Sequence, residues 1–240
     1  MTSSASKTAS KTARLVQSFD LAPEVRHFVF EVPEVERVVF EPGQFVSFHH
    51  EIGAEMVTRA YSIASPPNGD NRFDLCLNRV PGGPFSNFLF TMRPGEELQF
   101  DGPLGYFLLR QPVRDSLFVA TGTGVAPLRS MIHHLLQHGV TARLQLLFGT
   151  RFESTILYRQ EFEDLAARHP SFEFHATLSR EGPAWTGLRG HLQEHLFELL
   201  AGRTDVDVYV CGLKAMVNDV RARLKQNSFD RRSIIYEKYD

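Results

Sequence analysis

The first half of the chain alternates hydrophobic and polar residues over short stretches. This period of two is typical of half-buried strands. Five such stretches are RLVQSFD (14–20), VRHFVFEV (25–32), GQFVSFHH (43–50), RAYSIAS (59–65) and RFDLCLNRV (72–80). Turn-forming residues separate them, most densely in PPNGDN (66–71). Residues 14 to 110 are therefore predicted to form an antiparallel sheet or small barrel, with one short helix near 84–90.

The second half changes to short apolar strands that alternate with helical periods. In residues 127–138, Leu128, Met131, Ile132 and Leu135 share one helical face. The predicted strands are 115–120, 143–149, 172–178, 207–212 and 233–240, and the predicted helices are 127–138, 157–169, 190–202 and 214–226. Strands alternating with helices indicate a parallel sheet with helical crossovers. The chain is thus divided into a tail (1–13), a β domain (14–111) and an α/β domain (112–240).

Composition narrows the classes of protein that fit this pattern. The chain has 240 residues, of which 42% are hydrophobic and 22% charged, with a formal net charge of −2. Near-neutral charge gives no reason to expect a nucleic-acid partner. No apolar stretch reaches the roughly 20 residues of a membrane span. The Ser/Thr/Lys/Ala-rich start lacks the apolar core of a secretory signal, and we expect it to be disordered and the protein to be cytoplasmic.

Cysteine and histidine positions give no metal site. Only Cys76 and Cys211 occur, which excludes a built-in cysteine-ligated iron–sulfur cluster and argues against a Cys-rich zinc site. We expect both thiols to be reduced, although a disulfide between them stays open. The pairs His49–His50 and His133–His134 lack partners at metal-ligand spacing, so we interpret them as structural or surface residues.

A glycine-rich turn follows the first strand of the α/β half. LFVATGTGVAPLRSM places Gly122 and Gly124 between a strand and a helix, where glycines let the backbone approach a phosphate and the helix N-terminus offers free N–H donors. A bare Gly-x-Gly is also compatible with a simple tight turn. Pro127 stands where the common fingerprint has a third glycine, a position that a first helical turn tolerates.

Two arginines follow later strands of the same half. Arg151 lies after the second strand, where no carboxylate precedes Glu153, and Ser179–Arg180 follow the third. In dinucleotide folds an acidic residue there binds the ribose diol, whereas an arginine suits a 2′-phosphate. The arginines favour NADPH over NADH, unless both are only solvated surface charges.

The stretch RAYSIAS suits a flavin. Arg59 and Tyr61 share one face of the predicted strand, where a guanidinium can match pyrophosphate oxygens and the tyrosine ring can lie against an isoalloxazine. Ser62 would have to reach the edge of the ring. Downstream, Gly82 and Gly83 lead into the predicted short helix and offer a second phosphate-binding N-terminus. Each feature alone has a structural explanation, and their combination favours a flavin site.

These motifs together resemble the ferredoxin–NADP reductase superfamily. RAYSIAS is similar to its flavin signature, GGPFS to its Gly-x-x-Ser phosphate segment and GTGVAP to its nicotinamide-nucleotide turn. VYVCGLKAM is similar to its Cys-Gly segment, and YEKY to its carboxylate-plus-aromatic C-terminus. The motifs run in the family order from residue 59 to residue 239. The resemblance implies an antiparallel Greek-key β-barrel that binds FAD, followed by a Rossmann-like parallel α/β domain that binds NAD(P).

The resemblance also implies roles for individual residues. The catalytic residues would be Ser62 near flavin N5, Cys211 beside the nicotinamide, Glu237 for proton or charge balance, and Tyr239 over the flavin ring. Non-covalent FAD would be bound by Arg59, Ala60, Tyr61, Ser62, Cys76, Leu77, Asn78, Gly82, Gly83, Ser86 and Tyr239. The nicotinamide nucleotide would be bound by Thr121, Gly122, Thr123, Gly124, Arg151, Ser179, Arg180, Cys211 and Gly212.

Some of these positions have a second interpretation or depart from the family. Cys76 lies within a predicted strand, where a core thiol is the simpler interpretation, and Cys211 is open to the same one. Asp240 follows Tyr239, whereas plant-type members end on the aromatic residue, which weakens Tyr239 as a displaceable lid.

The prediction is an FAD-dependent NAD(P)H oxidoreductase that passes electrons to a separate ferredoxin-like protein, since no fused iron–sulfur or haem domain is expected here. We expect a monomer or weak dimer. Two alternatives stay open: a flavin or ferric reductase with a small-molecule acceptor, and a non-catalytic coupling subunit that binds flavin. The combination of Ser62, Cys211 and Glu237 favours catalysis.

Overall fold

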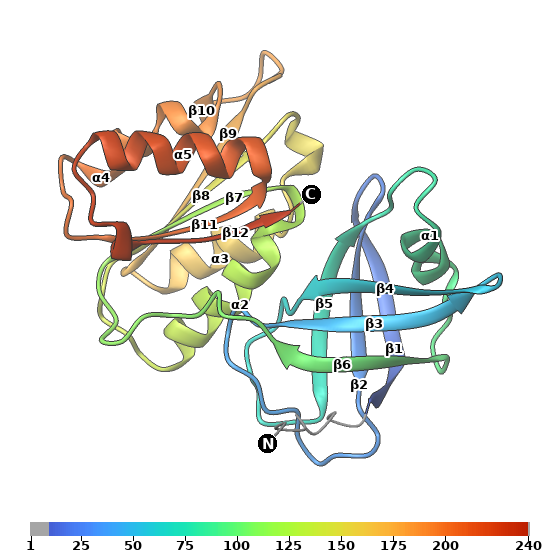
Figure 1. The fold of residues 1–240 in the computed structure, drawn as a ribbon. Coiled ribbons are helices and arrows are strands. Elements are labelled where there is room, and N and C mark those ends of the chain that lie inside the picture. The colour runs from blue at the N-terminus through green and yellow to red at the C-terminus, as the bar shows by residue number, and fades with distance from the viewer. Residues whose placement is uncertain (1–9, 240) are drawn as a thin grey trace, which may run out of the picture.

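A computed structural model describes residues 10–239, and its N-terminal half is a six-stranded antiparallel sheet (Figure 1). The strands lie in the order β4-β3-β6-β1-β2-β5, and an antiparallel bridge from Ile63, just after β4, to Leu75 in β5 joins the two end strands. The predicted barrel is thereby confirmed. Its elements are β1 (Lys11–Ala22), β2 (Val25–Glu31), β3 (Phe45–Ile52), β4 (Glu55–Ser62), β5 (Arg72–Asn78), α1 (Pro84–Thr91) and β6 (Glu97–Leu104).

Three details of this half differ from the sequence prediction. The strand predicted at 59–65 is β4, which runs from Glu55 to Ser62, so residues 63–65 follow the strand. The strand β1 begins at Lys11, so residues 11–13 belong to the sheet and not to the tail, because Ala13 is fully buried and pairs with Leu98. Residues 1–9 of the predicted tail lie outside the described residues. The strand β6 was not predicted, and it lies between β1 and β3 in the sheet and pairs with both.

The second half is a six-stranded parallel sheet in the order β10-β9-β8-β7-β11-β12. Helices α2 and α3 cover one face, and α4 and α5 cover the other, which confirms the α/β prediction. The elements are β7 (Ser116–Thr121), α2 (Val125–Gln137), β8 (Leu144–Thr150), α3 (Arg159–Arg168), β9 (Phe172–Leu178), β10 (Leu188–Arg189), α4 (Leu196–Leu200), β11 (Asp207–Leu213), α5 (Lys214–Gln226) and β12 (Ile234–Tyr239), with 3-10 turns at Gly122–Gly124, Glu153–Thr155, Leu192–Glu194 and Arg231–Ser233.

The predicted helix 190–202 is shorter in the structure. Only Leu196–Leu200 is α-helical, after a 3-10 turn at Leu192–Glu194. The buried residues Leu192, Leu196 and Leu200 recur every four positions, which produced the helical signal. Gly190 has φ +88°, which glycine adopts readily but which lies outside the right-handed helical region, so the chain is not helical at the predicted start.

The two halves share one hydrophobic cluster. Ala22, Ala64, Cys76 and Phe107 of the barrel pack with the residues that lie between the parallel sheet and α2 and α3. Beyond the barrel, the backbone N–H of Arg110 donates to the hydroxyl of Tyr209 in β11 at 2.8 Å. The face of the sheet that carries α2 is therefore the face turned toward the barrel.

Candidate active site

Residues from both halves meet where the end of β12 reaches the barrel (Figure 1). The Ser62 hydroxyl, at the end of β4, donates to Oε1 of Glu237 at 3.0 Å. The Tyr239 hydroxyl donates to Ser62 Oγ at 2.7 Å. Three of the four predicted catalytic residues thus form one hydrogen-bonded chain across the domain boundary. Asp240 lies outside the described residues.

Cys211 joins this group through the pairing of β11 with β12. Cys211 is the register partner of Glu237, and paired residues of neighbouring parallel strands project to the same face. Tyr239, two residues after Glu237, shares that face. Burial raises the pKa of the Cys211 thiol well above its usual range, and the nearby Glu237 raises it further. Cys211 is therefore a neutral thiol and not a ready nucleophile.

Glu237 is poised to hold a proton. Its side chain is half-buried, and burial raises its pKa above 4.5, opposed by the hydrogen bond from Ser62. Burial also raises the pKa of Tyr239 well above 10, so its hydroxyl stays protonated and donates. The arrangement offers two hydroxyls and a carboxyl with a raised pKa at one point, and it can position or exchange a proton there.

The glycine turn of the α/β half packs closely against the backbone of Cys211 and Gly212 in this site. A Cβ on Gly124 would lie 2.6 Å from the Cys211 carbonyl carbon and 2.7 Å from Gly212 Cα, so only glycine allows this approach. Residues Gly122–Gly124 form a 3-10 turn into α2, and in the described part of the chain no side chain caps either N-terminus. The Thr121 hydroxyl is buried there and has no hydrogen-bond partner among residues 10–239. Uncapped N–H groups and an unsatisfied hydroxyl fit a nucleotide phosphate.

The barrel supplies a second uncapped helix N-terminus at α1. Gly83 is the N-cap residue and makes no side-chain capping bond, and Gly82 precedes it at φ +72°. The Ser86 hydroxyl accepts from Val80 N at 3.0 Å and donates to the Gly83 carbonyl at 3.2 Å, so it closes the loop before α1. The free N–H groups of the first turn fit a phosphate, while Ser86 shapes the loop that presents them.

The flavin signature lies along β4, between these two features. Tyr61 is half-buried, with its ring centroid 6.2 Å from that of Phe85 in α1, and burial raises its pKa to about 12. Arg59 and Ala60 are exposed, and the Arg59 guanidinium donates to the Thr58 carbonyl at 2.7 Å. An exposed arginine beside a half-buried ring fits a flavin and its pyrophosphate.

The predicted FAD residues of β5 differ in burial. Cys76 and Leu77 are 5% and 3% exposed, whereas Asn78 is exposed. The Cys76 side chain packs in the cluster between the domains, and Leu77 packs in the barrel core. Both thus have core side chains, as the strand pattern predicted for Cys76, which leaves their backbone atoms for any cofactor contact.

The two predicted arginines lie side by side at the carboxyl ends of β8 and β9. Ser179 N donates to the Thr150 carbonyl at 3.0 Å, and Arg180 N donates to the Arg151 carbonyl at 2.9 Å. Both arginines are exposed, and the structure shows no hydrogen bond from either guanidinium within residues 10–239. Together they present positive charge at the edge where parallel sheets bind ligands.

The histidine pairs make local contacts. His50 stacks on Phe88 at 4.0 Å, His133 lies 2.7 Å from Glu161, and His134 packs against His138. No group of three metal-ligating side chains occurs among residues 10–239, and none of the helices described there is long and apolar enough to cross a bilayer.

Sequence reasoning did not single out Arg129, which lies beside the site. Its side chain is only 12% exposed and makes hydrogen bonds to both domains. The available signal was an arginine in the otherwise largely apolar first turns of this helix, two residues after Pro127.

Comparisons with known proteins match both halves. The family described as "Oxidoreductase FAD-binding domain" matches residues 12–108, and "Oxidoreductase NAD-binding domain" matches residues 118–222. Ferredoxin–NADP reductase B of Sorangium cellulosum is 44% identical over 237 residues, covering 95% of this chain and 97% of that protein.

Other relatives share part of their length or only the fold. The glycine betaine monooxygenase reductase subunit of Pseudomonas aeruginosa is 32% identical, and the match covers 86% of this chain and 58% of that protein. The FAD/NAD-binding domain of a nitric oxide dioxygenase from Vibrio cholerae superposes with a TM-score of 0.88 at 21% identity, covering 97% of this chain and 99% of that one.

Proposed function

Because the chain belongs to the ferredoxin–NADP reductase superfamily and is an NAD(P)H-dependent flavoprotein reductase, we propose that its electron acceptor is a ferredoxin and its preferred donor NADPH. The acceptor proposal is supported by the Sorangium cellulosum relative, which matches this chain over nearly its whole length. It is also supported by the two cysteines, both buried and neither in a cluster motif.

The observation that supports catalysis at the junction of the two domains is the hydrogen-bonded chain from Glu237 through Ser62 to Tyr239. It joins the flavin signature of the barrel to the last strand of the nucleotide domain. FAD, when bound, supplies the redox chemistry, and the protein supplies orientation and electrostatics. Ser62 and Glu237 hold a proton at the junction, and the neutral Cys211 thiol packs beside them and excludes water.

Binding roles follow from the same geometry. Arg59 and the first turn of α1 bind the FAD pyrophosphate, and Tyr61 and Tyr239 bind the flavin ring. The uncapped turn at Gly122–Gly124, with the unsatisfied Thr121 hydroxyl, binds the phosphates of the nicotinamide nucleotide. The remaining contacts predicted from the sequence stay predictions, together with the domain boundary at residue 111, the cytoplasmic location and the monomeric or weakly dimeric state.

The preference for NADPH is supported by Arg151 and Arg180. Their backbones are hydrogen-bonded to each other at 2.9 Å, which brings two exposed guanidinium groups to one edge. A 2′-phosphate is recognised by such groups. A charge-assisted hydrogen bond contributes about 1.5–3 kcal/mol, so loss of one arginine should raise the KM for NADPH about tenfold or more.

Anaerobic stopped-flow absorbance tests both parts of the proposal. We expect NADPH to bleach the flavin band faster than NADH, and the reduced protein to reduce a ferredoxin. In Arg151→Ala and Arg180→Ala, the bleaching by NADPH should become slower and the bleaching by NADH should not change. The matched control is Arg168→Ala, which removes an exposed arginine of α3. Equal rates with both nucleotides would refute the NADPH preference. Electron transfer to free flavin or ferric chelates but to no ferredoxin would refute the proposed acceptor.

A further inference from the structure

Two adjacent residues of α2 are hydrogen-bonded to two adjacent carbonyl groups of the barrel. The Arg129 guanidinium donates to the Ala64 carbonyl at 2.9 Å, and the Ser130 hydroxyl donates to the Ser65 carbonyl at 2.6 Å. Ala64, Ser65 and Ser130 are buried. We call these two bonds the interdomain clamp.

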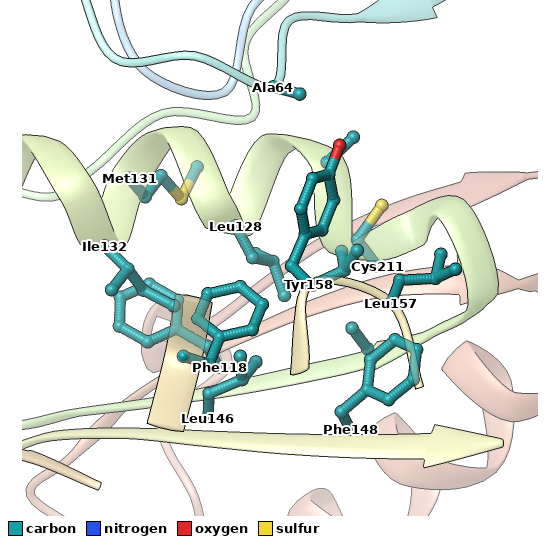
Figure 2. Close-up of a cluster of buried hydrophobic side chains, with 14 of the residues drawn as sticks. Ala64, Phe118, Leu128, Met131, Ile132, Leu146, Phe148, Leu157, Tyr158 and Cys211 are labelled. Atoms are coloured by element: carbon teal, nitrogen blue, oxygen red, sulfur yellow. The ribbon is translucent and has the colours of Figure 1, made fainter. Parts of the chain in front are cut away.

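The Arg129 guanidinium also contacts three side chains outside the clamp. Arg129 makes a bidentate ion pair with Glu161 of α3, at 2.6 and 2.9 Å. Its Cζ lies 4.7 Å from the centre of the Tyr158 ring, and Nη1 lies 3.6 Å from Asp74 Oδ2. Figure 2 shows the Tyr158 hydroxyl pointing from the core, beside α2, toward the segment that carries Ala64. The arginine therefore has one defined orientation.

Glu161 keeps its negative charge at neutral pH. Burial disfavours the ionised form of Glu161, but hydrogen bonds from His133 and Arg129 outweigh it and lower the pKa of Glu161 to about 2. The carboxylate therefore stays ionised at neutral pH and keeps Arg129 in place.

The barrel side of the clamp is continuous with Ser62. Ala64 and Ser65 come two and three residues after Ser62, and both are attached to β5. Ala64 N donates to the Asp74 carbonyl at 2.8 Å, and the Ser65 hydroxyl accepts from Asp74 N at 2.9 Å. A shift of these carbonyls would therefore move the end of β4, which positions Ser62.

The α2 side of the clamp is continuous with the glycine turn. Arg129 lies five residues after Gly124, a distance of roughly 7.5 Å along a helix that rises 1.5 Å per residue. Gly124 itself packs against the backbone of Cys211 and Gly212. The clamp thus connects the nucleotide-binding turn to the flavin-binding strand through two short, rigid stretches of chain.

We propose that Arg129, assisted by Ser130, is a positioning residue that fixes the separation of the Gly122–Gly124 turn from Ser62, and with it the distance over which hydride passes. This inference rests on the roles proposed for those residues. Other contacts, such as that of Arg110 with Tyr209, keep the domains together, so the loss of Arg129 changes alignment more than association. A misplacement of about 1 Å lowers such a rate about 100-fold.

The test compares Arg129→Lys with Arg143→Lys. Lysine keeps the charge but cannot form the planar fork to Glu161 and reach Ala64 as well. Arg143 is the matched control, since its guanidinium pairs with Glu173 at 2.7 Å on the sheet of the nucleotide domain. Each flavin-loaded protein is mixed with saturating NADPH, and the first-order bleaching rate, the kinetic isotope effect with 4-deuterated NADPH and the nucleotide Kd are measured. Hydrogen–deuterium exchange of residues 63–65 is followed separately.

For Arg129→Lys we expect flavin content and nucleotide Kd close to wild type, bleaching about 10- to 100-fold slower with a changed isotope effect, and faster exchange of residues 63–65. Arg143→Lys should match wild type in all five of these quantities. Wild-type bleaching per bound flavin in Arg129→Lys would overturn the proposal, as would a loss confined to flavin content. If Arg129→Lys does not fold, Ser130→Ala is judged by the same criteria.

The exchange measurement separates two kinds of failure. If neither NADPH nor NADH bleaches the wild-type flavin, the proposed roles of Ser62 and the glycine turn fail. Unchanged exchange in both Arg129→Lys and Ser130→Ala would instead show that the clamp does not order residues 63–65. That conclusion would hold whether or not either nucleotide bleaches the flavin.

Discussion

The approach of Gly124 to β11 predicts the effect of a single added methyl group. In Gly124→Ala, the Cβ would lie 2.6 Å from the Cys211 carbonyl carbon and 2.7 Å from Gly212 Cα, whereas ordinary contact begins at 3.4 Å. Both atoms belong to the backbone of β11, which is paired with β12 on one side and β7 on the other. The clash therefore cannot be relieved by the rotation of a side chain. The Cβ would lie closer still to the Cys211 carbonyl oxygen, so the turn must shift by about 1 Å to restore ordinary contact.

This shift has a cost in stability and a larger one in rate. Overpacking of a tight site costs about 1–3 kcal/mol. For a chain of this size that lowers Tm by about 2–12 °C. A displacement of this size at the nucleotide turn should slow flavin reduction by NADPH on the order of 100-fold.

Thermal unfolding and stopped-flow bleaching of the flavin measure the two effects on one preparation. Gly182→Ala is the control, because no atom of the residues that the structure describes lies within 4 Å of a Cβ at that position. Wild-type Tm and bleaching rate in Gly124→Ala would refute the reasoning, because the clash would then be relieved at no cost. Equal losses in Gly182→Ala would show that the effect is not local to the turn.

Two further predictions follow from buried ionisable groups. Burial raises the pKa of Glu237 above that of the unfolded chain, so the protein should lose stability as the pH rises from about 4.5 through that raised pKa. The Glu237→Gln variant should not show this loss. Its Tm should be higher than that of wild type at neutral pH but not near about pH 4. An equal difference in Tm at both pH values would contradict the pKa shift. Burial raises the pKa of Cys76 to about 12 and that of Cys211 well above its usual range, so iodoacetamide at about pH 8 should label neither thiol in the folded protein and both after unfolding, as read by mass spectrometry.

Much of the fold could be predicted because its two halves have different periods. Alternation of side chains identified five barrel strands, and the 3.6-residue period identified α2, α3 and α5. The strand β6 was missed because its sequence, ELQFDGPL, contains a Gly-Pro pair near its end, and such a pair is typical of a turn. The start of β1 was missed because Lys11 and Thr12 resemble the polar tail before them, and only the pairing with β6 makes them a strand.

The candidate site could be predicted where its residues lie in local motifs. Ser62, Glu237 and Tyr239 stand out in short stretches of sequence, and the structure brings them together. The interdomain clamp could not be predicted, because its acceptors are carbonyl groups that every residue carries. The partner of Arg129 in its ion pair, Glu161, is 32 residues away on α3, whose many charged residues are typical of a solvent-exposed helix face.

The chemistry of the clamp also decides which parts of the protein can be exchanged between relatives. The barrel contributes only main-chain oxygens at positions 64 and 65, while the nucleotide domain contributes the two side chains that bind them. A chimeric reductase can therefore take its barrel from a parent with a different residue at position 64, provided that the Ser65 hydroxyl still accepts from Asp74 N and keeps the backbone on the same path. The nucleotide domain has no such freedom at Arg129 and Ser130, so domain shuffling in this fold should be more tolerant of new barrels than of new nucleotide domains.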